Sequence, residues 1–116
     1  MRVALVYFFL LGLIVNADAE EFEEMGYGLQ SCATYGQDYK QNPDEAETVY
    51  FAWALGFMSG LNVGVKVMKA SPKNLSATTQ DAQRRFLREW CAAHPLSNYG
   101  DGVVDLLKTL PAVTGK

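Results

Sequence analysis

The feature that most constrains the fold is a run of 18 residues, 48–65, that contains no charged side chain. Acidic residues precede this run and lysines follow it, an order that complements the dipole of a helix. We therefore predict a long helix over residues 44–68. A helix that is apolar almost all round is either the central helix of a small bundle or a membrane span. We favour the central helix, because the run is shorter than a typical span and contains Ser59 and Asn62.

Small residues recur at every fourth position along this predicted helix, at Ala52, Gly56, Gly60 and Gly64. Residues with this spacing share one side of a helix, and their small size lets another backbone approach closely. We expect the stripe to pack against another helix of the same chain. A contact between two copies of the chain is the alternative.

Residues 1–19 have the pattern of a secretory signal peptide. A basic start is followed by an apolar run over residues 3–15 and by the small-x-small site Ala17-Asp18-Ala19. Thirteen apolar residues rise only about 20 Å as a helix, which is less than a bilayer core of about 30 Å requires. We therefore expect residues 1–19 to be cleaved, leaving residues 20–116 as one domain that is periplasmic or secreted and not integral to a membrane.

Three further helices are predicted on shorter segments, over residues 26–40, 78–93 and 101–110, from apolar positions at helical spacing. Prolines and turn residues separate these segments. No useful length of strand-like alternation occurs. The predicted architecture is an all-α domain of four helices, with the apolar, glycine-rich helix at its centre.

Cys32 and Cys91 are the two cysteines of the chain. Their separation excludes a CxxC redox motif, and with a single histidine they cannot complete a structural zinc site. In an oxidising compartment the simplest interpretation is one disulfide, with two free buried thiols as the alternative.

The sequence carries no catalytic signature, and we expect no enzyme activity, no cofactor and no metal site. His94 is the only histidine, and it lies at the expected end of a helix, where a cation complements the dipole. The acidic residues cluster where solvated acids are expected. The net charge of −3, with scattered basic residues, gives no basic face for nucleic acid.

One basic cluster, made of Arg84, Arg85 and Arg88, lies on the predicted third helix. It is either a solvated helix face or a partner-binding edge, since arginine is enriched in interface hot spots. Two aromatic residues share this ambiguity. We expect Trp53 to pack in the core, whereas Tyr99 could lie at the surface.

Several segments together resemble a group of small secreted bacterial proteins. They are Ser31-Cys32-Ala33-Thr34-Tyr35, then Tyr50-x-x-Trp53-x-x-Gly56-Phe57-x-Ser59-Gly60-x-Asn62, then Trp90-Cys91-x-x-His94-Pro95-Leu96. The chain is similar here to the HdeA-like periplasmic proteins and to the Rap-Tai immunity proteins. The resemblance implies a helical periplasmic domain without enzyme activity that is linked by a disulfide between Cys32 and Cys91.

The resemblance also implies two functions. Immunity members of such a group bind and block peptidoglycan amidases delivered by rival cells, whereas HdeA is an acid-stress chaperone. We therefore expect a protein-binding module of the cell envelope, of the immunity type, with an acid-stress chaperone as the alternative. The expected partner is an envelope protein, and the chain itself is expected to be a monomer or a homodimer.

Overall fold

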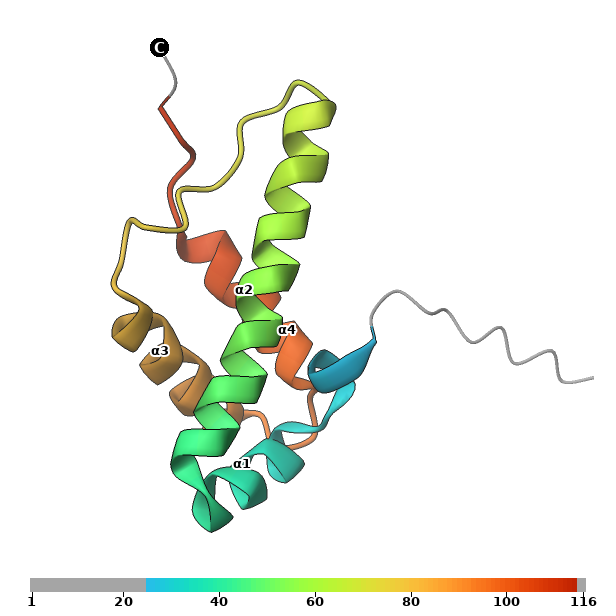
Figure 1. Ribbon diagram of the computed structural model, residues 1–116, viewed down its shortest axis with the longest axis vertical. Helices are drawn as coiled ribbons and strands as arrows, with labels where there is room; N and C mark the ends of the chain where they lie inside the picture. The colour runs from blue at the N-terminus through green and yellow to red at the C-terminus, as the bar shows by residue number, and fades with distance from the viewer. Residues whose placement is uncertain (1–24, 115–116) are drawn as a thin grey trace, which may run out of the picture.

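The computed structural model describes residues 25–114, and the predicted signal peptide lies outside them. The described chain is all-α, as predicted, with no strand among its elements. A short 3-10 helix precedes four α-helices (Figure 1). In chain order the elements are η1 (Gly26–Leu29), α1 (Cys32–Gln41), α2 (Pro43–Val67), α3 (Gln80–Ala93) and α4 (Tyr99–Thr109).

Polar side chains cap the starts of the α-helices. Ser31 accepts a hydrogen bond from the backbone of Thr34 at the start of α1, and Asn42 does the same for Glu45 at the start of α2. Such caps satisfy N–H groups that have no partner within the helix. The Ser31 cap also corrects one prediction. The expected first helix over residues 26–40 is two elements, because the backbone is extended at Gln30 and Ser31 begins a new helix.

A cluster of tyrosine rings forms one end of the core. Tyr35, Tyr50 and Tyr99 are each at most 3% exposed, and their ring centroids lie 4.9–5.1 Å apart. Tyr99 is therefore buried, and Trp53 is only half-buried. Aliphatic and aromatic side chains from α2, α3 and α4 complete the core: Phe51, Ala54, Met58, Leu87, Val103 and Leu106.

The disulfide between Cys32 and Cys91 is confirmed. It joins the first residue of α1 to α3, and both cysteines are 3% exposed. Backbone bonds lie beside it, because the N–H of Cys32 donates to the carbonyl of Ser97 at 2.7 Å. The start of α1 is therefore fixed to the end of α3 and to the turn that follows it.

The expectation that the glycine stripe packs within the chain is wrong. A Cβ atom built on Gly56, Gly60 or Gly64 would meet nothing within 4 Å, and Ala52 is exposed. Helix α2 has 25 residues, whereas α1, α3 and α4 have 10, 14 and 11. The shorter helices cover one side of α2, so the core takes the side opposite the stripe.

Among the described residues, α2 alone has the length and apolar composition of a helix that could cross a membrane. Only 22% of its most apolar 18-residue window is buried. The buried positions of α2 end at Met58, and the helix continues beyond them to Val67. Figure 1 shows this second half of α2 running past α3 and α4. The predicted central helix is thus central in its first half only.

A cluster of hydrogen bonds joins the loop after α2 to the end of α4 and the residues that follow it. The side-chain amide of Asn62 donates to the carbonyl of Lys73 and accepts from its N–H, at 2.8 and 2.9 Å. The Lys73 ammonium donates to the carbonyl of Leu110, and the N–H of Asn74 donates to the carbonyl of Pro111. The polar Asn62 of the apolar run therefore has a structural partner.

We expect substitution of two glycines, Gly28 and Gly36, by alanine to have opposite effects on stability. The Cβ of a Gly28→Ala variant would lie 2.1 Å from the indole of Trp53, whereas Gly36 has nothing within 4 Å. We expect Gly28→Ala to lower the free energy of unfolding by about 1–3 kcal/mol through overpacking. Gly36→Ala in α1 should raise it by up to about 1 kcal/mol through helix propensity. Urea unfolding followed by circular dichroism measures both, and equal effects of the two variants would contradict the packing of Trp53.

Candidate functional site

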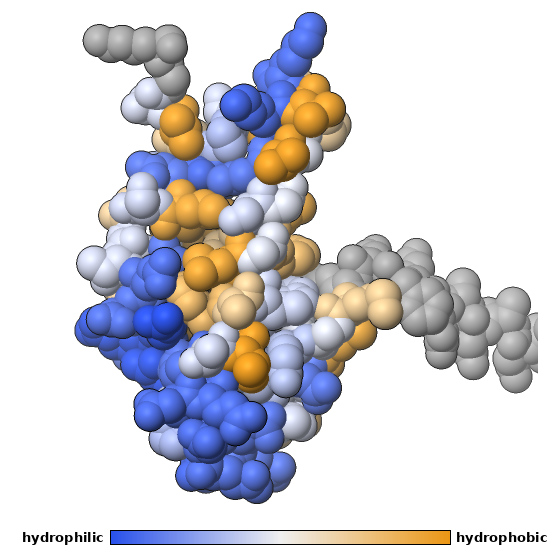
Figure 2. All heavy atoms as spheres, viewed as in Figure 1, coloured by the Kyte–Doolittle hydropathy of each residue, from blue (hydrophilic) through white to orange (hydrophobic). Residues whose placement is uncertain are grey.

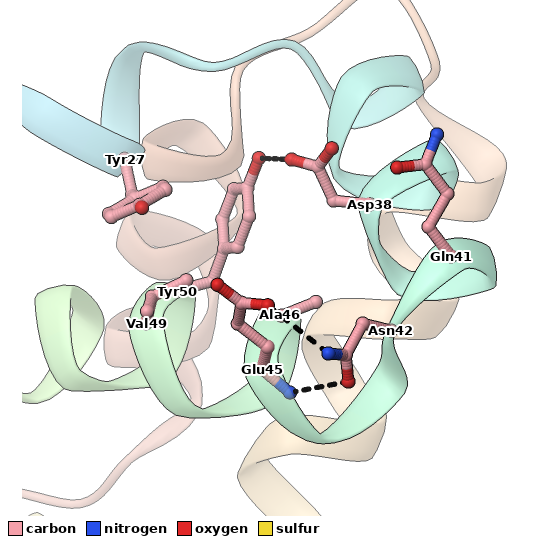
Figure 3. Close-up of a pocket in the computed structure, with 8 residues that line it drawn as sticks. All are labelled: Tyr27, Asp38, Gln41, Asn42, Glu45, Ala46, Val49 and Tyr50. Carbon is pink, nitrogen blue, oxygen red and sulfur yellow. Dashed lines mark hydrogen bonds between the residues drawn. The ribbon is translucent and has the colours of Figure 1, made fainter.

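A pocket of about 270 Å³ lies at the elbow between α1 and α2 (Figure 3). The end of α1 supplies Asp38 and Gln41, the start of α2 supplies Glu45, Ala46, Val49 and Tyr50, and Asn42 and Tyr27 complete the wall. The pocket exists because Pro43 starts α2 directly after Asn42, so that the two helices leave the elbow in different directions.

Asp38 faces this pocket and is held by a tyrosine. The hydroxyl of Tyr50 donates to Oδ2 of Asp38 at 2.7 Å (Figure 3). Burial raises the pKa of Tyr50 well above its usual value of 10, and the hydrogen bond to Asp38 raises it further. The phenol therefore stays protonated and keeps donating at neutral pH.

Glu45 is the second carboxylate that lines the pocket. Its backbone N–H donates to Oδ1 of Asn42 at 3.2 Å, and its Oε2 accepts from Nδ2 of Asn42 at 3.1 Å. This reciprocal pair is a helix cap that also fixes the carboxylate beside the pocket. Within the described residues, neither Glu45 nor Asp38 forms a salt bridge.

The pocket can therefore hold a cationic group. Two carboxylates without a basic partner in the described chain place negative charge at its wall, and the ring of Tyr27 lies 4.8 Å from that of Tyr50. Carboxylates bind ammonium and guanidinium groups by charge-assisted hydrogen bonds, and aromatic faces attract cations. The sequence patterns did not predict this site. Its signal was the cap sequence Asn42-Pro43, which brings Asp38 and Glu45 together across the elbow.

The predicted arginine cluster lies on the side of the elbow where α3 meets α1 and α2. Arg88 forms a salt bridge with Glu47 of α2, and Nε of Arg84 lies 3.9 Å from the same carboxylate. Arg84 also covers the ring of Phe51, and Arg88 covers that of Tyr39. These two arginines attach α3 to α1 and α2. Arg85 differs because its side chain is exposed.

His94 lies away from the elbow pocket. Its Nδ1 is 2.7 Å from the carbonyl of Trp90, and its ring stacks on the indole of Trp90 with centroids 4.1 Å apart. In the described part of the chain, no group of three histidine, cysteine or acidic side chains could hold a metal ion. The indole of Trp90 donates to Asp105, which lowers the pKa of that carboxyl.

A second hollow is a shallow apolar groove on the outer side of α2. Its lining residues are Gly56, Phe57, Gly60, Leu61, Gly64, Val65 and Met68. Apolar side chains near the groove are exposed to solvent, since Val63 is 64% exposed and Val67 is 76% exposed. In the face shown by Figure 2, hydrophilic residues gather around the α1–α2 elbow and hydrophobic ones lie further along α2. The polar pocket and the apolar groove are thus separate surfaces.

No protein-family model matches the chain, no curated protein matches its sequence, and no solved structure matches its fold. Function is therefore inferred from the sequence and from the geometry described above.

Proposed function

We propose that the protein is a non-enzymatic protein-binding module of the periplasm, of the immunity type that inhibits a secreted peptidoglycan amidase. The elbow pocket carries this proposal, because it presents two carboxylates that have no basic partner among the described residues. A lysine or arginine side chain of the partner would complete it. The signal-peptide pattern and the disulfide support a role in the cell envelope.

The rigidity of the elbow supports binding without a large rearrangement. The disulfide fixes the start of α1, and Tyr50 and Asn42 hold the two carboxylates from different sides. Preorganised groups lose less conformational entropy when a partner binds. Arg85 is exposed on α3 and belongs to the proposed binding surface, where it would contact an acidic group of the partner. Arg84 and Arg88 would help by keeping α3 in place.

The proposal is tested with purified protein and a panel of secreted peptidoglycan amidases, starting with any encoded beside its gene. We expect stoichiometric inhibition of peptidoglycan hydrolysis by at least one enzyme. Asp38→Asn combined with Glu45→Gln should weaken that inhibition at least about tenfold, since charge-assisted hydrogen bonds are each worth about 1.5–3 kcal/mol. Glu89→Gln is the matched control, because Glu89 is exposed on α3 and does not line the pocket.

Inhibition that is unchanged in the double variant would remove the pocket from the interface. Absence of binding to every amidase would contradict the immunity function. If the protein instead suppresses aggregation of an unfolded client near pH 3, the alternative function, that of an acid-stress chaperone, replaces the immunity function.

A further inference from the structure

We propose that the carboxyl-terminal end of α2 binds the surface of an anionic phospholipid membrane, while the rest of the domain stays outside the lipid. The contact surface, which we call the apolar tip, consists of four large apolar side chains, each at least 40% exposed: Leu61, Val63, Val67 and Met68. The elbow pocket lies at the opposite end of α2 (Figure 1). The inference therefore goes beyond the proposed function and does not depend on it.

The four side chains form one continuous face because of their spacing along the helix. Val63 and Val67 are four residues apart, and Leu61 and Met68 are seven apart, so each pair forms a row along α2. Gly64 lies between the two rows, and a Cβ atom built on it would meet nothing within 4 Å. The buried positions of α2 end before these rows begin, so the core leaves both rows open to solvent.

The charged residues of this part of the chain are all lysines. Residues 48–80 contain Lys66, Lys69 and Lys73 and no acidic residue. Lys66 and Lys69 are exposed, and neither forms a salt bridge within the described residues. In Figure 2, hydrophilic residues lie directly beside hydrophobic ones at this end of α2. Charge complementarity therefore favours an occupant that presents negative charge beside an apolar phase.

An anionic phospholipid membrane supplies both of these properties. Exposed apolar side chains can enter the boundary between headgroups and acyl chains, while neighbouring lysines bind the phosphates of anionic lipids. The long lysine stem lets the ammonium stay at headgroup depth while its apolar neighbours go deeper. A second copy of the chain fits less well. Two apolar tips that face one another would bring lysines together with no acidic side chain between them.

The distribution of charge also orients the domain on the membrane. Acidic residues gather at the elbow, near the start of α2: Asp38, Asp44, Glu45 and Glu47. From Glu47 to Val63 the helix rises about 24 Å, which is about three Debye lengths in physiological salt. The elbow carboxylates are therefore screened from the lipid phosphates. With the apolar tip on the membrane, the elbow pocket faces the aqueous phase.

Co-sedimentation with phospholipid vesicles tests the proposal on the purified chain without its predicted signal peptide, residues 20–116. One set of vesicles contains phosphatidylcholine and phosphatidylglycerol in equal amounts, and the other contains phosphatidylcholine alone. We expect binding to the anionic vesicles to be at least about tenfold tighter, since each lysine near an anionic surface contributes about a factor of five. Raising the salt concentration should weaken this binding.

Two pairs of variants locate the contact. Val63→Ser combined with Val67→Ser should weaken binding at least about tenfold. Leu96→Ser is its control and should change nothing, because Leu96 is 97% exposed but lies on the turn between α3 and α4. Lys66→Gln should weaken binding about fivefold, whereas Lys40→Gln removes the same charge at the end of α1 and should have little effect. Circular dichroism should show the same fold throughout, since serine and valine have similar helix propensities.

Wild-type protein that stays in the supernatant with both kinds of vesicle would overturn the proposal. So would equal binding to neutral and anionic vesicles, or an equal loss of binding in the Leu96→Ser variant. If the Val63 and Val67 double variant loses inhibition of an amidase while the wild type does not bind vesicles, the apolar tip is a protein contact instead. Asp38→Asn combined with Glu45→Gln should leave vesicle binding intact, so failure of the elbow pocket and failure of the apolar tip are distinguishable.

Discussion

Replacing Cys32 and Cys91 together by serine is expected to lower the free energy of unfolding by about 4 kcal/mol. The bridge closes a loop with a sequence separation of 59 residues, and the chain-entropy treatment gives about this value for a loop of that length. A domain of this size typically has a total stability of about 5–15 kcal/mol. Urea unfolding of the variant and of the oxidised wild type measures the difference.

Reduction of the wild type is the matched control, because it breaks the same bond without changing a side chain into a hydroxyl. Its effect should agree with that of the double serine variant. A loss below about 1 kcal/mol in both would show that the contacts beside the bridge hold α1 and α3 together without it. Those contacts include the hydrogen bond from Cys32 to Ser97.

Tyr50→Ala is expected to cost about 3–5 kcal/mol of stability, the range for removing a large buried aromatic side chain. Tyr50 is 1% exposed, and its ring contacts those of Tyr27, Tyr35 and Tyr99. Tyr50→Phe keeps these ring contacts and loses only the hydrogen bond to Asp38, so it should cost about 1 kcal/mol. Similar losses in the two variants would mean that the hydroxyl, and not the ring, is the main contribution.

The same residue gives a pH dependence with a definite sign. Burial raises the pKa of Tyr35, Tyr50 and Tyr99 above the usual value for tyrosine. For an acid whose pKa is higher in the folded state, the stabilisation is complete below the unfolded pKa of about 10 and is lost as pH rises above it. Tyr50→Phe should therefore lose less stability than the wild type between pH 9 and 11.

The helices and their order could be predicted because local signals specify them. Apolar residues at helical spacing marked α2, α3 and α4, and prolines or turn residues marked their ends. The disulfide was predictable from the count of cysteines and the expected compartment. Ser31 shows the limit of this approach, because its cap lies inside a segment whose composition is acceptable for one continuous helix.

The open face of α2 and the elbow pocket could not be predicted from the sequence, because both depend on how the helices pack against one another. The small residues from Ala52 to Gly64 would suit a buried or an open face equally well. The open face follows from the length of α2 relative to its neighbours, which is a property of the whole fold. The elbow pocket likewise requires the tilt between α1 and α2, and the burial of Tyr99 requires the packing of η1 and α1 around it.

The hydrogen bonds around Lys73 determine how a mechanical force applied to the last residues would be transmitted through the molecule. The N–H of Val113 donates to the carbonyl of Pro72, and the next residue, Lys73, is held on both sides by Asn62 in α2. Tension on the tail would therefore pass directly to the longest helix and would bypass much of α4. A cargo or surface attached at the carboxyl end would be mechanically coupled to α2.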